Sequence, residues 1–227
     1  MSDLSIFDIA GPIMVGPSSS HTAGACKIGQ FARAIFDDTP KKVTLYLHGS
    51  FAEVYKGHAT DRALLGGVMG FKPSDPRLKN SFKLAKDKGI DYLFVPTDLG
   101  KDQHPNTVKI VLENGKHIMS VTGSSVGGGM VNISKLDEFN LDVGATAGKY
   151  YTLLIGHKDG LMVMEQVSRM LAEMELVVVN RVDSKHKHQI LTTFSIDGHW
   201  ITKDEIKKIE TVEGVEFVRS LATLENQ

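Results

Sequence analysis

The sequence predicts an α+β protein of two domains, residues 1–148 and 149–227. Three observations predict this fold class. Segments with the alternation of β-strands and segments with helical periodicity are interspersed along the chain. A run of small residues, Gly144–Gly148, separates two parts and indicates a domain boundary. The part that follows shows the element order β-α-β-β-α-β in about 70 residues, which is the ferredoxin-like arrangement.

The composition is that of an ordinary globular protein. The chain has 227 residues, of which 41% are hydrophobic and 23% charged, with a formal net charge of −1. This near-neutral balance gives no electrostatic footprint for nucleic acid or for an anionic membrane surface. No apolar run approaches the roughly 20 residues that span a bilayer. Met1–Ala10 carries acids and lacks the apolar core of a signal peptide, so we expect a cytoplasmic protein.

A single cysteine, Cys26, excludes an internal disulfide framework and indicates a reducing compartment. It also excludes a four-cysteine zinc or iron–sulfur site built by this chain alone. We therefore expect no metal ligands in this chain.

The first dense stretch of polar residues follows Ser5–Val15, which we expect to be a strand or irregular. A Gly-Pro turn leads into Ser18-Ser19-Ser20-His21-Thr22, and helical periodicity then continues to about Phe36. One serine suffices to cap the helix. The surplus hydroxyls and amides would form an anion cradle at the positive end of the helix dipole, where His21 would stay neutral. The alternative is an ordinary helix start with more serines than capping needs.

A second stretch repeats this pattern after the predicted strand Lys42–His48. His48–Ala52 and Lys56–Asp61 carry glycines, His58 and Thr60 ahead of a predicted helix. Two helix starts that each bear a histidine and hydroxyls would suit a small carboxylate ligand if they converge. The alternative is that Thr60 and Asp61 only cap the helix and that His58 is exposed.

The rest of the first domain contains a break, a helix and three strands. Asn114-Gly115 predicts a hairpin with a two-residue type I′ turn. Ser124–Gly129 predicts a flexible loop whose amides approach a ligand, although a linker or bulge explains a glycine triplet equally well. The expected break is Pro73–Pro76, the helix Arg77–Lys88, and the strands Tyr92–Val95, Thr107–Leu112 and His117–Val121.

The second domain is predicted as strands and helices in close succession. A methionine-containing stripe from Leu161 to Met174 indicates a core helix rather than a cofactor site. Asp183, His186 and His188 could be drawn as metal ligands, but a solvated turn over Asp183–His188 is the preferred interpretation. The other expected elements are the strand Tyr151–Ile155, the turn Lys158–Gly160, the strands Leu176–Val182 and Gln189–Ile196, the helix Lys203–Glu210 and the strand Val215–Leu221.

Four motifs together resemble the β chain of the iron–sulfur-dependent L-serine dehydratases. They are Gly16–Gly24, His48–Ala52, Lys56–Asp61 and Ser125–Gly129. The resemblance covers essentially the whole chain and implies an N-terminal allosteric-substrate-binding-type domain followed by an ACT domain. It implies deamination of L-serine to pyruvate and ammonia without pyridoxal phosphate. It also implies a separate α subunit that ligates a [4Fe-4S] cluster, whose open iron position binds the substrate hydroxyl and assists its departure.

The resemblance also implies which residues line the active site. His58 is the preferred base at Cα, because a nearby Lys56 ammonium would lower its pKa, and His21 is the second candidate. With His58 as the base, His21 would position the substrate. In the ACT domain the candidate effector-binding residues are Asp159 and Gly160, and edge-to-edge pairing of two such domains would cause self-association. The substrate-binding residues would be Ser18, Ser19, Ser20, Thr22, Lys56, Thr60 and Asp61.

Two other function classes compete with this one. The first is a regulatory module that binds an amino acid without chemistry, since similar domains occur together in some phosphoglycerate dehydrogenases. Two neutral imidazoles favour catalysis over that alternative. The second is a self-sufficient hydrolase with a nucleophile among Ser18–Ser20, which is disfavoured because the chain has no Gly-x-Ser-x-Gly elbow.

Overall fold

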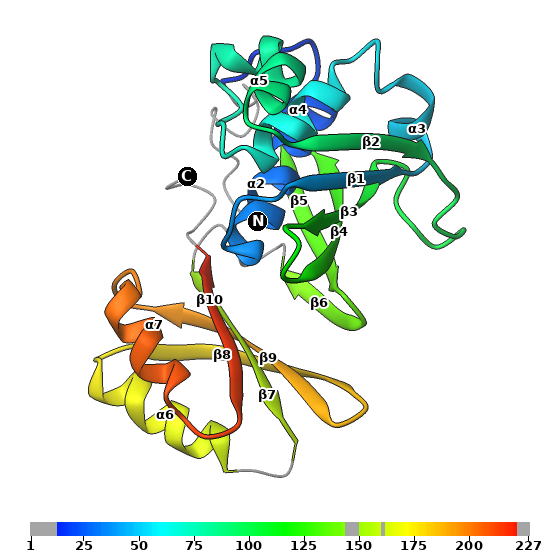
Figure 1. The fold of residues 1–227 in the computed structure, drawn as a ribbon. Coiled ribbons are helices and arrows are strands. Elements are labelled where there is room, and N and C mark those ends of the chain that lie inside the picture. The colour runs from blue at the N-terminus through cyan, green and yellow to red at the C-terminus, as the bar shows by residue number, and fades with distance from the viewer. Residues whose placement is uncertain (1–12, 144–149, 160–161, 222–227) are drawn as a thin grey trace, which may run out of the picture. The chain divides into compact units, whose positions relative to one another are not determined.

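The computed structural model describes residues 13–143, 150–159 and 162–221. Most of Ser5–Val15 and all of Gly144–Gly148 lie outside the described residues. The chain forms two compact units, Met1–Asp137 and Glu138–Gln227 (Figure 1). The units thus divide before Gly148, where the sequence had placed the boundary. Within the described ranges, none of the helices has the length and apolar character that crossing a bilayer requires.

A six-stranded sheet with the order β2-β1-β3-β4-β5-β6 organises the first part of the chain (Figure 1). β1 pairs with β2 in parallel, and the β1–β3, β3–β4 and β4–β5 pairs are antiparallel. The sequence had predicted neither β5 nor β6. The strands are β1 (Lys42–Leu47), β2 (Asp91–Pro96), β3 (Thr107–Glu113), β4 (Ile118–Gly127), β5 (Met130–Leu136) and β6 (Phe139–Val143).

The helices of this unit are mostly short. The predicted helix Arg77–Lys88 is interrupted, because Asn80 leaves helical backbone angles (φ −110°, ψ 16°) between a 3₁₀ turn and α5. Asp75 caps that 3₁₀ turn by accepting the Arg77 amide. The helical elements are η1 (a π-helical turn, Ser19–Gly24), α2 (Ala25–Phe36), α3 (Ser50–Val54), α4 (Thr60–Val68), η2 (Pro76–Asn80) and α5 (Ser81–Asp87).

α2 packs on the sheet and against α4. Its apolar face, Ile28, Phe31 and Ile35, is buried as the spacing predicted. The α2–α4 contact depends on two glycines. A Cβ at Gly29 would overlap the carbonyl oxygen of Leu64, and a Cβ at Gly67 would overlap the carbonyl oxygen of Cys26. The two backbones can therefore approach closely only without side chains at these positions.

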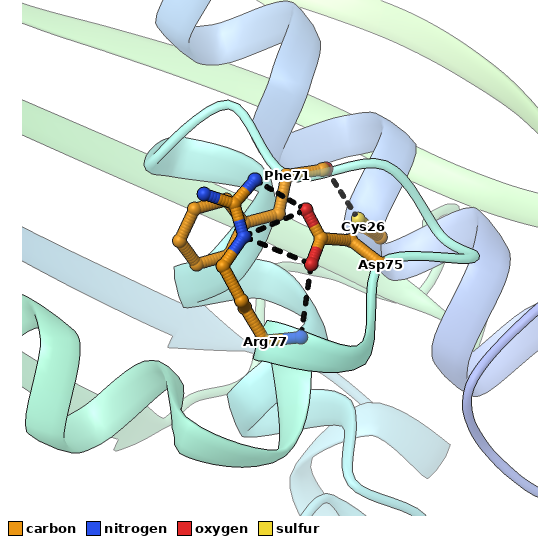
Figure 2. Close-up of polar contacts among 4 residues, drawn as sticks. All are labelled: Cys26, Phe71, Asp75 and Arg77. Carbon is orange, nitrogen blue, oxygen red and sulfur yellow. Dashed lines mark hydrogen bonds and ion pairs between the residues drawn. The ribbon is translucent and has the colours of Figure 1, made fainter.

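Cys26 lies buried in this contact, and Figure 2 shows its surroundings. Its Sγ donates to the carbonyl oxygen of Phe71 at 3.1 Å. The Arg77 guanidinium lies over the Phe71 ring, 4.3 Å from the ring centroid. The same guanidinium donates hydrogen bonds to both carboxylate oxygens of Asp75. Burial raises the pKa of the Cys26 thiol to about 12. Cys26 is therefore a structural thiol and not a nucleophile or a metal ligand.

Two turns of the first unit differ from the prediction. Asn114 is not at a positive φ, as a type I′ turn would need; its Oδ1 instead accepts the amides of Lys116 and His117, so the connection is a longer Asx-type turn. Ser124 and Ser125 belong to β4 rather than to a flexible loop. The glycine triplet turns the chain into β5, and all three φ values are positive (112°, 59° and 78°). Backbone conformation alone therefore requires these glycines.

Beyond β6, which follows Asp137 and joins the first sheet, the described residues of the second unit form two helices and a four-stranded sheet with the order β10-β7-β9-β8. All three strand pairs are antiparallel. β8 continues to His186, so the expected turn over Asp183–His188 is reduced to its last two residues. Leu161 lies outside the described residues, and α6 begins at Val163. The elements are β7 (Tyr151–Lys158), α6 (Val163–Glu173), β8 (Val177–His186), β9 (Gln189–Asp197), α7 (Lys203–Glu210) and β10 (Val215–Leu221).

Gly67→Ala should destabilise the protein, because the added methyl group must push α2 and α4 apart at backbone atoms. Overpacking of this kind costs about 1–3 kcal/mol and outweighs the gain of up to ~1 kcal/mol in helix propensity. Urea unfolding would measure the loss. Gly57→Ala is the matched control, since its Cβ would approach no atom closer than 3.7 Å. Equal stability of the two variants would contradict the packing argument.

Candidate functional site

The two histidine-bearing stretches lie together in the structure. The ring centroids of His21 and His58 are 5.0 Å apart, with the ring planes tilted by 46°. The hydroxyl of Thr22 donates to the carbonyl oxygen of His58 at 3.3 Å. Because α2 and α4 pack against each other, the turns that precede them are held side by side.

The serine stretch forms the first turn of this helical segment. Ser18 is the serine that caps the helical segment: its Oγ accepts the His21 amide at 3.2 Å, and its carbonyl oxygen accepts the Thr22 amide at 2.9 Å. Ser19 and Ser20 are half-buried on the turn. As the first residues of a helical segment, they have amides without an intrahelical acceptor. The turn can therefore offer both hydroxyls and N–H groups to an anion.

Two hydroxyls contact the His21 ring. The Nε2 atom lies 3.0 Å from the Oγ of Ser50, and the Nδ1 atom lies 3.4 Å from the Oγ of Ser18. The Phe51 ring packs edge-on at 5.4 Å. Burial, and next the charge of a protonated His58, lower the pKa of His21 below its usual value of 6.5. His21 is therefore neutral at physiological pH and fixed in orientation.

Ser50 was not among the residues predicted from the sequence. It is the first residue of α3, directly after Gly49, whose φ is 54° and whose Cβ would lie 2.7 Å from the carbonyl oxygen of Pro105. The glycine thus allows the sharp turn that aims Ser50 at His21. The signal in the sequence was the Gly-Ser pair after the predicted strand, but its target could not be identified without the fold.

The second stretch is built differently from the expectation. His58 is exposed, and Ala59, which precedes the first residue of α4, adopts a left-handed conformation (φ 58°) without a side-chain cap. Thr60 is fully buried, and within the described residues its hydroxyl has no hydrogen-bond partner. Thr60 therefore does not cap α4, contrary to the capping interpretation. The exposed Lys56 places its ammonium 5.6 Å from the Tyr55 ring centroid.

Asp61 is a buried carboxyl group in the first turn of α4. It is 7% exposed, and its Oδ1 accepts the Arg62 amide at 2.7 Å. Burial raises the pKa of Asp61, and the hydrogen bond from Arg62 opposes that shift. A buried carboxylate that stays ionised can attract a cationic group.

Ser125, from the glycine-rich motif, packs behind the serine turn. A Cβ at Gly24 would overlap the Ser125 hydroxyl, so this contact requires the glycine. The Ser125 amide donates to the carbonyl oxygen of Asn106 at 3.0 Å. Among the described residues, the Ser125 Oγ and the Asn106 Oδ1 are both buried without a partner. Ser125 is fully buried and supports the turn from behind rather than lining its open side.

The residues expected to bind an effector lie in the second unit. The Asp159 amide donates to the carbonyl oxygen of His188 at 2.9 Å, and its carboxylate pairs with Lys185. Gly160 lies outside the described residues. Asp183, once considered as a metal ligand, instead pairs with Arg181 at 2.6 Å.

The described residues offer no side-chain cluster suited to a metal. Within the described ranges, no group of three or more His, Cys, Asp or Glu residues could hold a metal ion. The buried Cys26 already donates to a carbonyl oxygen. An iron–sulfur cluster therefore does not fit these residues as ligands.

Comparison with known proteins identifies close relatives. A family model described as "Serine dehydratase beta chain" matches residues 5–88. The chain is 44% identical over 199 residues to "L-serine dehydratase, beta chain" of Peptoniphilus asaccharolyticus, covering 87% of this chain and 88% of that one. It is 42% identical over 214 residues to "Probable L-serine dehydratase, beta chain" of Bacillus subtilis (strain 168), covering 92% and 94%.

More distant relatives are longer. The match to "L-serine dehydratase" of Helicobacter pylori (strain J99) is 31% identical and covers 59% of this chain but 33% of that protein. Among solved structures, the ACT domain from GTP pyrophosphokinase of Chlorobium tepidum matches 31% of this chain and 95% of its own length, with 16% identity and a TM-score of 0.27. A score that low carries no argument about this chain.

The neutral His21 should make stability depend on pH. Because its pKa is lower in the folded chain than in the unfolded one, the unfolded chain binds the proton first as pH falls below about 6.5. The free energy of unfolding should therefore decrease from pH 7 towards pH 5, and His21→Gln should flatten that decrease. Urea titrations across this range would measure it. His188→Gln, at an exposed position, should keep the wild-type slope; a wild-type slope in His21→Gln would contradict the prediction.

Proposed function

The chain belongs to the L-serine dehydratase β chains, a family of lyases, and from this premise we propose that it is half of a two-subunit enzyme that deaminates L-serine to pyruvate and ammonia. The other half would be a separate α chain that holds a [4Fe-4S] cluster. The observation that carries the proposal is the pairing of a fixed, neutral His21 with an exposed His58, 5.0 Å apart, beside an anion-binding helical turn.

The lengths of the relatives support a separate α chain. In Helicobacter pylori, the part that matches this chain is 33% of a longer protein named L-serine dehydratase. In the proposed enzyme, a second polypeptide would correspond to the part of the longer protein that this chain does not match. The described residues of this chain do not fit as cluster ligands, since Cys26 is buried and no metal-binding group is present among them. The roles below are therefore limited to holding the substrate and moving a proton.

The geometry favours His58 as the base that removes the α-proton. Its ring nitrogens have no hydrogen-bond partner among the described residues, whereas both ring nitrogens of His21 lie near hydroxyls. An imidazole without a competing hydrogen bond can accept a proton directly. His21, held by Ser18 and Ser50, would position the substrate. Ser50 is thus added to the site as a positioning residue.

The remaining candidates divide by charge. The serine turn, with its hydroxyls and helix N-terminus, and the Lys56 ammonium would bind the substrate carboxylate. Asp61 would attract the ammonium group. Thr22 and Thr60 would hold the turn that carries His58, Thr22 through its hydrogen bond to the carbonyl oxygen of His58. The full set in this proposal is Ser18, Ser19, Ser20, Thr22, Ser50, Lys56, Thr60 and Asp61.

Co-expression with a candidate α chain, followed by an assay for serine-dependent pyruvate, tests the proposal. Activity should require both chains. The isolated chain, reconstituted anaerobically with iron and sulfide, should show no cluster absorbance above a protein-free control, because it lacks ligands. Serine binding to this chain without pyruvate formation in any complex would favour the regulatory module instead.

The two histidines should respond differently to substitution. In the two-chain complex, His58→Ala should lower kcat by about 10²–10⁴, the usual loss for a general base, with KM little changed. His21→Ala should lower kcat/KM at least as strongly, with KM raised. Near-normal kcat in His58→Ala, together with its loss in His21→Ala, would exchange the two roles.

We also propose that residues 149–227 form a ferredoxin-like ACT domain that pairs with a second copy. The observed element order and the strand order β10-β7-β9-β8 support this assignment. β8 is an edge strand whose Val177, Val178, Val179 and Val182 are 38–61% exposed, and unpaired strand edges favour association. The full chain should sediment as a dimer, and Val182→Lys should shift it towards monomer. A monomeric wild-type chain would contradict the proposal.

A further inference from the structure

Four aromatic side chains form a cluster at the outer strand of the first sheet, through two stacked and two edge-on ring contacts. We call Tyr55, Phe82, Tyr92 and Phe94 the aromatic edge. The Phe82 and Tyr92 ring centroids are 5.4 Å apart, and those of Tyr55 and Phe94 are 5.9 Å apart. Phe94 also lies 6.0 Å from Tyr92 and 6.2 Å from Phe82. All four remain at least partly exposed, Tyr92 by 37%.

The strand that carries two of these residues is itself open. β2 pairs with β1 and, within the described residues, with no other strand, so its outer row of backbone groups faces away from the sheet. Natural proteins usually protect such an edge with charge, a bulge or a covering segment. β2 has such residues only at its ends, Asp91 and Pro96, and between them it presents Tyr92 and Leu93, the latter 56% exposed. An open edge with apolar side chains indicates a surface that another polypeptide covers.

Two cations lie over the rings. The Lys56 ammonium is 5.6 Å from the Tyr55 centroid, and the Arg62 guanidinium carbon is 5.8 Å from the Phe82 centroid. Aromatic and arginine side chains are the residues most enriched at the centres of protein–protein interfaces. The composition of the aromatic edge is therefore that of an interface rather than of a solvated face.

The aromatic edge is joined to the candidate site through the backbone of residues 54–60. The carbonyl oxygen of Tyr55 accepts the Thr60 amide at 3.0 Å, and that of Val54 accepts the His58 amide at 3.1 Å. The turn that presents His58 is therefore bonded to the residue whose ring begins the aromatic edge. Arg62 belongs to the same helix as Thr60 and Asp61. A chain that covers His58 must contact this surface or pass beside it.

We propose that the aromatic edge and β2 form the surface that docks the α chain. This inference rests on the proposed function, in which the α chain must reach across the substrate to His58. A second copy of this chain is the weaker occupant, because it would bring a second base instead of the missing ligand set. Docking here would place the partner beside the one imidazole of the pair that is exposed, and it would pair or cover the open strand.

The test uses the full chain and a tagged α chain. Tyr92→Asp places a charge on the aromatic edge and should weaken association about tenfold or more, as expected for an aromatic anchor. Ile118→Asp is the matched control: Ile118 is 67% exposed on β4, which β1 and β3 separate from β2, and its variant should bind as the wild type does. Association would be measured by titration, and pyruvate formation would be recorded at saturating α chain.

Hydrogen exchange on the wild-type proteins gives a readout that does not depend on how the variants fold. Amides of Asp91–Pro96 should exchange more slowly in the complex, whereas those of Val163–Glu173 should not change.

A wild-type complex with normal activity, unprotected β2 amides and undiminished binding by Tyr92→Asp would overturn the inference but leave the proposed function intact. Protection of β2 in the isolated chain that grows with its concentration would assign the surface to a second copy. Failure of the wild-type chains to associate would instead refute the proposed function.

Discussion

The close approach of α2 and α4 is the constraint on which the candidate site depends. At Gly29 and Gly67 the backbone of one helix lies where a side chain of the other would stand. Because of this contact, the turns that lead into the two helices lie next to each other. The hydrogen bond from Thr22 to the carbonyl oxygen of His58 then joins the turns directly. Catalytic groups held by rigid elements keep their mutual distance, which a pair of free loops could not do.

The two histidines are alike in sequence but not in surroundings. His21 is half-buried, its ring lies against Phe51, and hydroxyls contact both nitrogens. His58 is exposed, and the hydrogen bonds that hold it among the described residues are made by its backbone. Two imidazolium groups with centroids 5.0 Å apart would repel each other, so the pair accepts one proton more readily than two. Burial also disfavours charge on His21 and, together with His58, lowers the pKa of the His21 imidazole. These unequal environments support the proposed division of roles between two residues of the same type.

Sequence patterns predicted the local structure best where one short segment determines it. The Ser18 cap, the apolar face of α2 and the strands β1 and β2 follow from residues close together in the chain. The patterns were less informative where a residue far away in the chain determines the local conformation or the contact of a side chain. Asn114 makes a longer turn because its side chain binds Asp38 and the amides of its own turn. Ser50 could not be assigned because its target, His21, lies 29 residues away. Capping by Thr60 was the alternative interpretation of its stretch, but the left-handed Ala59 precedes α4 without a side-chain cap, and the Thr60 hydroxyl is buried without a partner among the described residues.

If His58 acts as the proposed base, its exposure gives the partner chain a second purpose. Removing a proton from Cα creates negative charge that water alone stabilises poorly, so an enzyme surrounds the reacting atoms with fixed dipoles and excludes bulk solvent. Around His21 the chain provides such surroundings: hydroxyls, a helix N-terminus and the Phe51 ring. Beside His58 it provides a backbone carbonyl bonded to Thr22 and an open side. The substrate would therefore be held on one side by this chain and remain uncovered on the other. A covering chain would complete the site by excluding water from His58, in addition to any group that it carries.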